Sequence, residues 1–440
     1  MAKVQPRLFR GMRDFLPAEM NARDHMLAII KGVFRTYGYQ PLETPAVEYM
    51  DILAGKYGDE GEKLIYPLAY KGGKTLALRY DLTVPLARLV AANPDIPRPF
   101  RRYQIQPVWR ADRAQIGRGR FREFYQCDVD CVGSASVLVE LEIATMTADV
   151  FKGLGFPDFR IRINHRAISQ AVVQKTGETR VADALRALDK LDKIGLPGVQ
   201  DEMEKYGIPQ GKACDILTLL QLGMDLPGPE RLRMLTEQIG GSPEVDSAAR
   251  DIHEVLVNLD RFEIDQVAFD PFLARGLDYY TGMVFETDLP TSPEFGSLAA
   301  GGRYDDLVAV FSETPEPACG VSFGLDRIHT AMDKLDLIPD ANRSASADLL
   351  VALFDSDSAG RSLEVAQQLR RVGIPVELYP EAVRLKKQFA FAHKRGIPMV
   401  IVPGPDEWDD GRKVTLKNMG TGEQQTLTLD QLIKHVRPES

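Results

Sequence analysis

Cysteine is scarce in this sequence, with four residues among 440: Cys127, Cys131, Cys214 and Cys319. Four scattered thiols are too few for a disulfide framework in a chain of this length, so we expect a protein of a reducing, cytoplasmic compartment. Cys127 and Cys131 lie four residues apart, with no CxxC motif and no histidine at ligand spacing. We therefore expect no metal site at these cysteines.

Long apolar runs are also missing. No segment approaches the roughly 18 apolar residues of a membrane-spanning helix. The N-terminal stretch MAKVQPRLFRGMRDF has basic residues but no apolar core, so we expect no secretory signal and no membrane partner. With 44% hydrophobic and 27% charged residues, the composition is that of a globular chain, and the length suits two or three domains.

Net positive charge is absent too, because 63 acidic residues outnumber 54 basic ones and leave a net charge of −9. This average argues against a polyanionic partner, but binding to nucleic acid depends on local charge. Eight arginines between Arg98 and Arg122 face a single acid, Asp112, and residues 382–396 carry five Lys or Arg and no acid. A charge run is often only a solvated surface, yet arginines interleaved with aromatic residues favour bound phosphates or carboxylates.

The order of predicted elements favours an α+β fold with an antiparallel sheet, because runs of strands are set apart from the helices. Strands are predicted at 100–109, 120–130, 159–164, 283–288 and 317–324, and helices at 18–37, 134–153 and 325–335. Residues 1–335 are predicted to form this first domain, with a helical insertion at about 167–260. A polar linker at 336–347 then leads to an α/β domain at 348–440 with a largely parallel sheet.

The arginine-rich region has the pattern of two strands around a loop, RRYQIQPVWR and then GRFREFYQCDVD, which ends at Asp130. The second strand places Phe124, Gln126, Asp128 and Asp130 on one face. Buried carboxylates are costly unless paired, so this face suits a cationic or hydrogen-bonding small ligand. An ion-pair ladder on an exposed sheet face is the alternative.

Three further segments contain candidate binding groups. LARGLDYYTG (273–282) has adjacent tyrosines, of which a strand would direct only one towards a given pocket. SLAAGGRYD (297–305) has two glycines that allow close backbone approach to a ligand. ACGVSFGLDRI (318–328) is typical of a strand that leads into a helix, with Arg327 in the first turn, where helix N-termini attract anions.

In this order the four segments resemble the signatures of class II aminoacyl-tRNA synthetases, and among them the histidyl-tRNA synthetase family. The region around Pro45 resembles motif 1, residues 101–130 resemble motif 2, and residues 318–328 resemble motif 3. LARGLDYYTG and SLAAGGRYD resemble the two histidine-specific signatures. The likeness extends over essentially the whole chain, and it implies a class II catalytic domain with a helical insertion, followed by an anticodon-binding domain.

The resemblance implies an enzyme that activates histidine with ATP, releases pyrophosphate, and transfers histidine to the 3′ end of its tRNA. ATP and Mg²⁺ are the implied cofactors, and motif 1 implies a homodimer. By similarity, Arg110 holds the α-phosphate, Arg327 contacts the γ-phosphate and the adenine, and Phe124 stacks on the adenine. Asp112 belongs to the same ATP-binding set. Arg275 faces the α-phosphate and the carboxylate, so it is implied to be catalytic together with Arg110 and also to bind histidine.

Histidine needs a pocket for its ammonium group and a reader for its imidazole. By similarity, Asp81 and Thr83 take the α-amino group with help from Gln126. Asp130 and Tyr280 read the two ring nitrogens, with Tyr279 nearby. A carboxylate and a phenol can satisfy the donor and the acceptor of an imidazole, and such a pocket rejects apolar amino acids, which would leave its polar groups unpaired.

Two features depart from the pattern of many bacterial members. The loop ADRAQIGRG (111–119) is closer to the longer, eukaryote-like type, and Asp130 stands where many have glutamate. In the last domain, the cluster RLKKQF (384–389) is either a contact for the RNA backbone or a solvated helix face.

Two other functions are compatible with this fold. Catalytically inactive paralogues serve as regulatory subunits of ATP phosphoribosyltransferase, but they generally lack the anticodon-binding domain and the signature arginine, which is Arg275 here. A synthetase for threonine, proline or glycine would not have the Tyr279–Tyr280 pair or the acid at Asp130.

Overall fold

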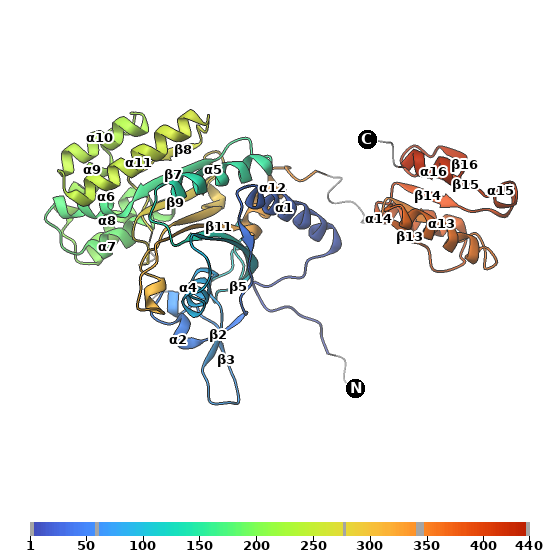
Figure 1. The fold of residues 1–440 in the computed structure, drawn as a ribbon, viewed down its shortest axis with the longest axis horizontal. Coiled ribbons are helices and arrows are strands. Elements are labelled where there is room, and N and C mark those ends of the chain that lie inside the picture. The colour runs from blue at the N-terminus through green and yellow to red at the C-terminus, as the bar shows by residue number, and fades with distance from the viewer. Residues whose placement is uncertain (1–3, 58–60, 276–278, 340–346, 437–440) are drawn as a thin grey trace. The chain divides into compact units, whose positions relative to one another are not determined.

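The chain folds into two structural units, and the central sheet of the first has eight strands (Figure 1). The computed structural model describes residues 4–57, 61–275, 279–339 and 347–436. Across the sheet the strands are β1 (Gln40–Pro41), β5 (Phe100–Trp109), β6 (Glu123–Val132), β11 (Ala318–Gly324), β10 (Ala299–Arg303), β9 (Met283–Asp288), β7 (Arg160–His165) and β8 (Val267–Phe269). The pairings β1–β5 and β7–β8 at the two edges are parallel and all others are antiparallel. This arrangement confirms the predicted α+β fold.

The two faces of the sheet differ in character because side chains alternate along each strand. On one face, Phe323 of β11 packs 5.7 Å from Phe34 and 6.1 Å from Phe151, measured between ring centroids. Phe34 belongs to α1 (Pro17–Thr36) and Phe151 to α5 (Leu138–Gly153), so these two helices cover the apolar core of the sheet. The opposite face presents Ser322 of β11 and the polar residues of β6 to the cavity described below.

The predicted helical insertion leaves the sheet at the end of β7 and returns at β8. Its helices are α6 (Arg166–Lys175), α7 (Val181–Leu188), α8 (Leu191–Lys205), α9 (Gln210–Leu220), α10 (Gly228–Ile239) and α11 (Pro243–Arg261). They gather at one end of the sheet (Figure 1). The remaining elements of the unit are α2 (Met50–Leu53), α4 (Thr83–Ala92), α12 (Leu325–Lys334) and a small antiparallel sheet of β2 (Val47–Tyr49), β4 (Leu76–Leu78) and β3 (Pro67–Leu68).

The two glycines of SLAAGGRYD lie inside β10, and their close approach is to a neighbouring strand. A Cβ atom on Gly301 would lie 2.0 Å from the carbonyl oxygen of Gly320 in β11. A Cβ atom on Gly320 would in turn lie 2.0 Å from Oδ1 of Asp130. The glycines therefore allow the strands and the Asp130 carboxylate to pack closely. Gly301 also lines the cavity described below, so the expected approach to a ligand stays a prediction.

The second unit contains the residues from Ile338 onward, and most of the predicted linker 336–347 lies outside the described residues. Its sheet has the order β13 (Val376–Leu378), β12 (Leu349–Val351), β14 (Met399–Val402), β15 (Lys413–Asn418) and β16 (Gln424–Thr428). Its helices are α13 (Ala359–Arg371), α14 (Leu385–Arg395), α15 (Pro405–Asp409) and α16 (Leu429–Val436).

In this second sheet, β13, β12 and β14 are parallel, as the sequence predicts, but β14, β15 and β16 pair antiparallel. The expectation of a largely parallel sheet is therefore wrong for its second half, where Asn418 and Glu423 close a tight hairpin. Val365 of α13 and Leu432 of α16 pack on one face of the sheet, and Ala392 of α14 packs on the other. Within the described part of the chain, no helix combines the length and apolarity needed to cross a membrane.

Candidate active site

A cavity of about 840 Å³ opens on the polar face of the central sheet. Its walls come from β6, β10 and β11, from the loop between β5 and β6, from the first turn of α12, and from the turn between α7 and α8. Every site residue that the sequence predicts lines this one cavity: Asp81, Thr83, Arg110, Asp112, Phe124, Gln126, Asp130, Arg275, Tyr279, Tyr280 and Arg327. The structure thus brings together residues from four distant segments, while the ligand group that each of them contacts stays a prediction.

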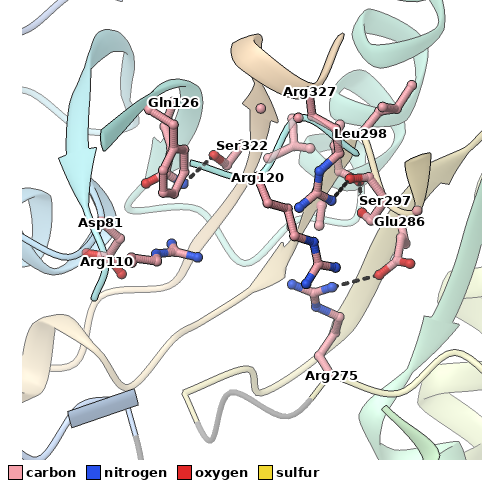
Figure 2. Close-up of a pocket in the computed structure, with 18 of the residues that line it drawn as sticks. Asp81, Arg110, Arg120, Gln126, Arg275, Glu286, Ser297, Leu298, Ser322 and Arg327 are labelled. Atoms are coloured by element: carbon pink, nitrogen blue, oxygen red, sulfur yellow. Dashed lines mark hydrogen bonds and ion pairs between the residues drawn. The ribbon is translucent and has the colours of Figure 1, made fainter. Parts of the chain in front are cut away.

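Arginines dominate one side of the cavity. Arg110 follows β5; its Nε donates to the carbonyl oxygen of Tyr80 at 3.1 Å, and its guanidinium carbon lies 5.2 Å from the ring centroid of Phe124. Arg327 lies in the first turn of α12 and donates to the carbonyl oxygen of Ser297. Arg275 lies across the cavity, where its guanidinium is paired with Glu286, and Arg120 points towards it from the loop after β5 (Figure 2).

The clustering of cations is unfavourable in the absence of an anion. Burial lowers the pKa of Arg327 to about 10, and the charges of Arg120, Arg110 and Arg275 add to this effect. Burial also opposes the charge of Arg275, but the charge of Glu286, together with those of Tyr280, Asp189 and Tyr279, outweighs burial, and the pKa of Arg275 is raised. The cavity therefore has a strong positive potential at Arg327, of the kind that binds phosphate groups.

Carboxylates gather on the other side of the cavity. Asp81 accepts hydrogen bonds from the hydroxyl of Tyr57 at 3.0 Å and from the N–H of Val84 at 3.1 Å, which holds it at the start of α4 beside Thr83. Burial raises its pKa, although these hydrogen bonds and Arg110 act in the opposite direction. A buried carboxylate that lines a cavity favours a cationic ligand.

Asp130 is anchored from two sides. The guanidinium of Arg102 in β5 lies 2.8 Å from its Oδ2, and the hydroxyl of Tyr304 donates to its Oδ1. Arg102 is fully buried and Asp130 is 3% exposed. Because the carboxylate is held by both partners, its orientation towards the cavity does not depend on a ligand.

Asp128 lies between Gln126 and Asp130 on the same face of β6 and is 2% exposed. The side-chain amide of Gln126 donates to the Ser322 hydroxyl at 2.7 Å (Figure 2), and Ser322 is hydrogen-bonded to Asp128 in turn. Among the residues that the structure describes, the second oxygen of Asp128, Oδ1, has no hydrogen-bond partner. Burial raises the pKa of Asp128 to about 7, Arg102 opposes the increase, and Asp130 adds to it.

Tyr279 and Tyr280 both line the cavity, with ring centroids 4.8 Å apart. The expectation that only one of them could face a given pocket is wrong, because these residues precede β9 and are not in a strand, so their side chains do not alternate. The preceding residues 276–278 of the same signature lie outside the described residues.

Several residues that line the cavity have no assigned role from the sequence: Arg120, Asp128, Glu286, Ser322, Tyr304, Asp189, Asp192 and Lys193. Arg120 belongs to the arginine-rich loop and Tyr304 belongs to GGRYD, so both lie in segments that the sequence already marks as candidate binding segments. Glu286 is an acid in the apolar stretch MVFETD. The insertion residues have no sequence signal, because only the tertiary fold brings the turn between α7 and α8 to the cavity.

Comparison with known proteins agrees with this geometry. A family model described as histidyl-tRNA synthetase matches residues 11–328, and one described as anticodon binding domain matches residues 349–439. A histidine–tRNA ligase of Cytophaga hutchinsonii is 40% identical, with 98% of this chain and 99% of that protein covered. One of Gloeobacter violaceus is also 40% identical, with 95% and 96% covered. The crystal structure of histidyl-tRNA synthetase from Nostoc sp. PCC 7120 is 30% identical, covers 99% of both chains, and has a TM-score of 0.85.

Proposed function

The chain belongs to the histidyl-tRNA synthetase family, and on that premise we propose that it is a histidine–tRNA ligase. It activates histidine with ATP to histidyl-adenylate and pyrophosphate, and it then transfers histidine to the 3′ end of its tRNA. The observation that carries the proposal is the convergence of an arginine cluster and a carboxylate cluster in one cavity. A triphosphate and an amino acid with a cationic ammonium group are complementary to these two sides.

The arginine side takes ATP. Arg110 and Arg275 hold the α-phosphate, Arg327 meets the γ-phosphate and the adenine, and Asp112 and Phe124 complete the nucleotide site. The repulsion that lowers the pKa of Arg327 supports this role, because a bound polyphosphate neutralises the cluster.

The carboxylate side takes histidine. Asp81, Thr83 and Gln126 bind the α-ammonium group, and the unpartnered oxygen of Asp128 adds negative charge beside them. These carboxylates are the counter-charges that a buried ammonium requires.

The imidazole lies between Asp130 and Tyr280, with Tyr279 nearby. Asp130 retains free acceptor positions, because a carboxylate has about four lone-pair sites and its oxygens face only Arg102 and Tyr304 in the structure. A fixed carboxylate and a phenol together read both ring nitrogens, and an apolar side chain in the same place would leave them unpaired.

The chemistry needs positive charge and positioning more than acid–base groups. A carboxylate oxygen of histidine attacks the α-phosphorus, the bond to the bridging oxygen breaks, and pyrophosphate leaves. The terminal ribose hydroxyl of the tRNA then attacks the activated carbonyl, and AMP leaves. In the first step an anion approaches a polyanion, so Arg110 and Arg275 lower the barrier where negative charge concentrates.

Mg²⁺ would neutralise phosphate charge. The described residues form no cluster of three candidate metal ligands, but Glu294 lines the cavity; Glu286 lines it too, with its oxygens paired to Arg162 and Arg275. This donor set fits an ion held mainly by phosphates and water with one or two carboxylates, which is the usual coordination of Mg²⁺ with nucleotides.

The family also supports a tRNA partner, a homodimer and a cytoplasmic location. The match of residues 349–439 to an anticodon-binding model supports tRNA recognition by the second unit. The resemblance of the region around Pro45 to motif 1 supports a symmetric dimer, and the low cysteine content fits a reducing compartment. The regulatory-subunit alternative finds no support, because Arg275 lines the cavity and the anticodon-binding unit is present.

The decisive measurement is the exchange of labelled pyrophosphate into ATP by the purified protein. We expect exchange only when histidine is supplied, and not with threonine, proline or glycine. Exchange that depends on another amino acid, or no exchange with histidine, would overturn the proposed function.

A further inference from the structure

The helical insertion reaches the cavity through one short turn. The connection between the end of α7 at Leu188 and the start of α8 at Leu191 contributes Asp189 to the lining of the cavity, and the first turn of α8 contributes Asp192 and Lys193. The insertion therefore forms part of the wall beside the catalytic arginines.

Arg162 of β7 connects this turn to the sheet. Its Nη2 lies 2.7 Å from Oδ2 of Asp192 and 2.8 Å from Oε1 of Glu286. The side chain of Arg162 is 7% exposed and that of Asp192 is 59% exposed. A buried, sheet-borne cation is thus shared between a rigid acid of the sheet and a half-exposed acid of the insertion.

Glu286 carries the connection to the catalytic centre. It stands directly opposite Arg162 in the pairing of β7 with β9, and its second oxygen, Oε2, accepts from Nη1 of Arg275 at 2.7 Å (Figure 2). The four side chains form one continuous series, Asp192–Arg162–Glu286–Arg275, from the insertion to the arginine at the reacting phosphate. The link between Arg162 and Glu286 is buried within the sheet, the link between Glu286 and Arg275 is partly buried, and the link to Asp192 is half-exposed.

We propose that Glu286 and Arg162 are positioning residues for Arg275, and that Asp192 makes their geometry depend on the seating of the helical insertion over the cavity. This inference rests on the proposed function, because Arg275 has a reaction to perform only if the protein activates an amino acid. Arg275 reaches the α-phosphate from a loop and not from a strand, so its direction is determined by Glu286. A displacement of about 1 Å at a catalytic group can reduce a rate by about 100-fold.

The competition for Arg162 explains why Asp192 matters. Arg162 also has Asp288 at 2.8 Å from its Nε and Asp270 at 3.4 Å from its Nη1, so each side of the guanidinium has an acid. When Asp192 withdraws, the balance of these attractions changes and the guanidinium is free to turn away from Glu286. The half-exposed link is the weak one, because water and salt screen the attraction in exposed ion pairs.

The test compares Asp192→Asn with a matched control, Asp183→Asn. Asp183 lies on α7 and forms an ion pair with Arg186 at 3.2 Å, but this pair is exposed and does not line the cavity. For Asp192→Asn we expect kcat for histidine-dependent pyrophosphate exchange to fall about threefold to tenfold, with KM for ATP and histidine within twofold of the parent. Asp192→Glu should restore kcat to within twofold, and Asp183→Asn should leave all three constants unchanged.

Glu286→Gln tests the inner link. A glutamine can accept through one oxygen only, so it cannot hold both arginines, and we expect kcat to fall about 10-fold to 100-fold while KM for ATP does not rise. A parental kcat in Asp192→Asn, an equal fall in Asp183→Asn, or a rise in KM for ATP as the main effect of Glu286→Gln would overturn the proposal.

Deuterium exchange at residues 186–194 provides a readout that does not need activity. We expect faster exchange in this segment for Asp192→Asn than for the parent and for Asp183→Asn, and equal exchange would show that Asp192 does not seat the turn. A parent without histidine-dependent exchange of pyrophosphate would refute the proposed function, while the deuterium measurement would still decide whether the turn is held by Arg162.

Discussion

Replacement of Arg327 by glutamine is expected to stabilise the unliganded protein and to weaken ATP binding at the same time. The pKa of this guanidinium is lowered from its ordinary value to about 10, first by burial and then by Arg120, Arg110 and Arg275. At about 1.4 kcal/mol per pH unit, this decrease corresponds to roughly 3 kcal/mol. Arg327 is protonated at pH 7 in both the folded and the unfolded chain, so the whole amount opposes folding at neutral pH.

The variant loses part of the stability that it gains by removing the buried charge of Arg327. Glutamine gives up the hydrogen bond to the carbonyl oxygen of Ser297 and some packing of the aliphatic stem, which we set at about 2 kcal/mol. The net stabilisation is then about 1 kcal/mol, or a rise of about 1–3 °C in the melting temperature of the unliganded protein. Loss of a charge-assisted hydrogen bond to phosphate costs about 1.5–3 kcal/mol, so KM for ATP should rise by roughly 10-fold to 100-fold.

Thermal unfolding with and without ATP, together with KM for ATP from pyrophosphate exchange, measures both effects. Arg101→Gln is the matched control, because Arg101 is paired with Glu142 at 2.8 Å and does not line the cavity. The control should lose stability and keep its KM. A lower melting temperature of unliganded Arg327→Gln, combined with a KM for ATP within threefold of the parent, would refute the reasoning that this cation is held for a polyphosphate.

Three further variants test the remaining parts of the site and the second unit. Arg275→Ala should lower the rate of histidine activation by at least about 100-fold, because the charge of Arg275 acts mainly in the transition state. The affinity for histidine, measured by calorimetry, should stay within roughly tenfold of the parent. Near-normal turnover would contradict the catalytic role of Arg275. Burial raises the pKa of Asp128 to about 7, so the parent's KM for histidine should fall as the pH rises through this value and the counter-charge appears. Asp128→Asn should lose this dependence and keep only the one that comes from the imidazole of free histidine, which titrates at about pH 6.5. Because the pKa of Asp128 is higher in the folded than in the unfolded chain, the folded state binds a proton that the unfolded state releases between about pH 4 and about pH 7. The free energy of unfolding of the parent should therefore decline over this pH range. In urea unfolding, Asp128→Asn should lose this part of the decline. Lys386 and Lys387 lie exposed in the first turn of α14. Their joint replacement by alanine should weaken tRNA binding in filter-binding assays and reduce the dependence of this binding on salt. An unchanged salt dependence would mean that the two lysines are only solvated surface.

The local patterns of the sequence predicted five of the eight strands of the central sheet in the first unit. Alternation predicted β5, β6, β7, β9 and β11 to within a few residues, and the loss of strand signals located the helical insertion. The second unit was predicted less well, because β16 is polar and mostly exposed, although β15 alternates buried Val414 and Leu416 with polar residues. The β10 strand was missed because a glycine pair is typical of a turn, whereas here the glycines allow β10 and β11 to approach closely.

The sequence also predicted that the motif arginines, the tyrosine pair and the acids of β6 belong to one site. In the structure all of them line one cavity, and the role of each stays a prediction. What the tertiary structure alone decided is how they are held. Arg102 anchors Asp130, Tyr304 reaches it across 174 positions of the chain, and Glu286 joins Arg162 across 124. Periodicity reports the face on which a side chain lies, but an ion pair between distant segments depends on strand order and register, and these form only when the sheet assembles.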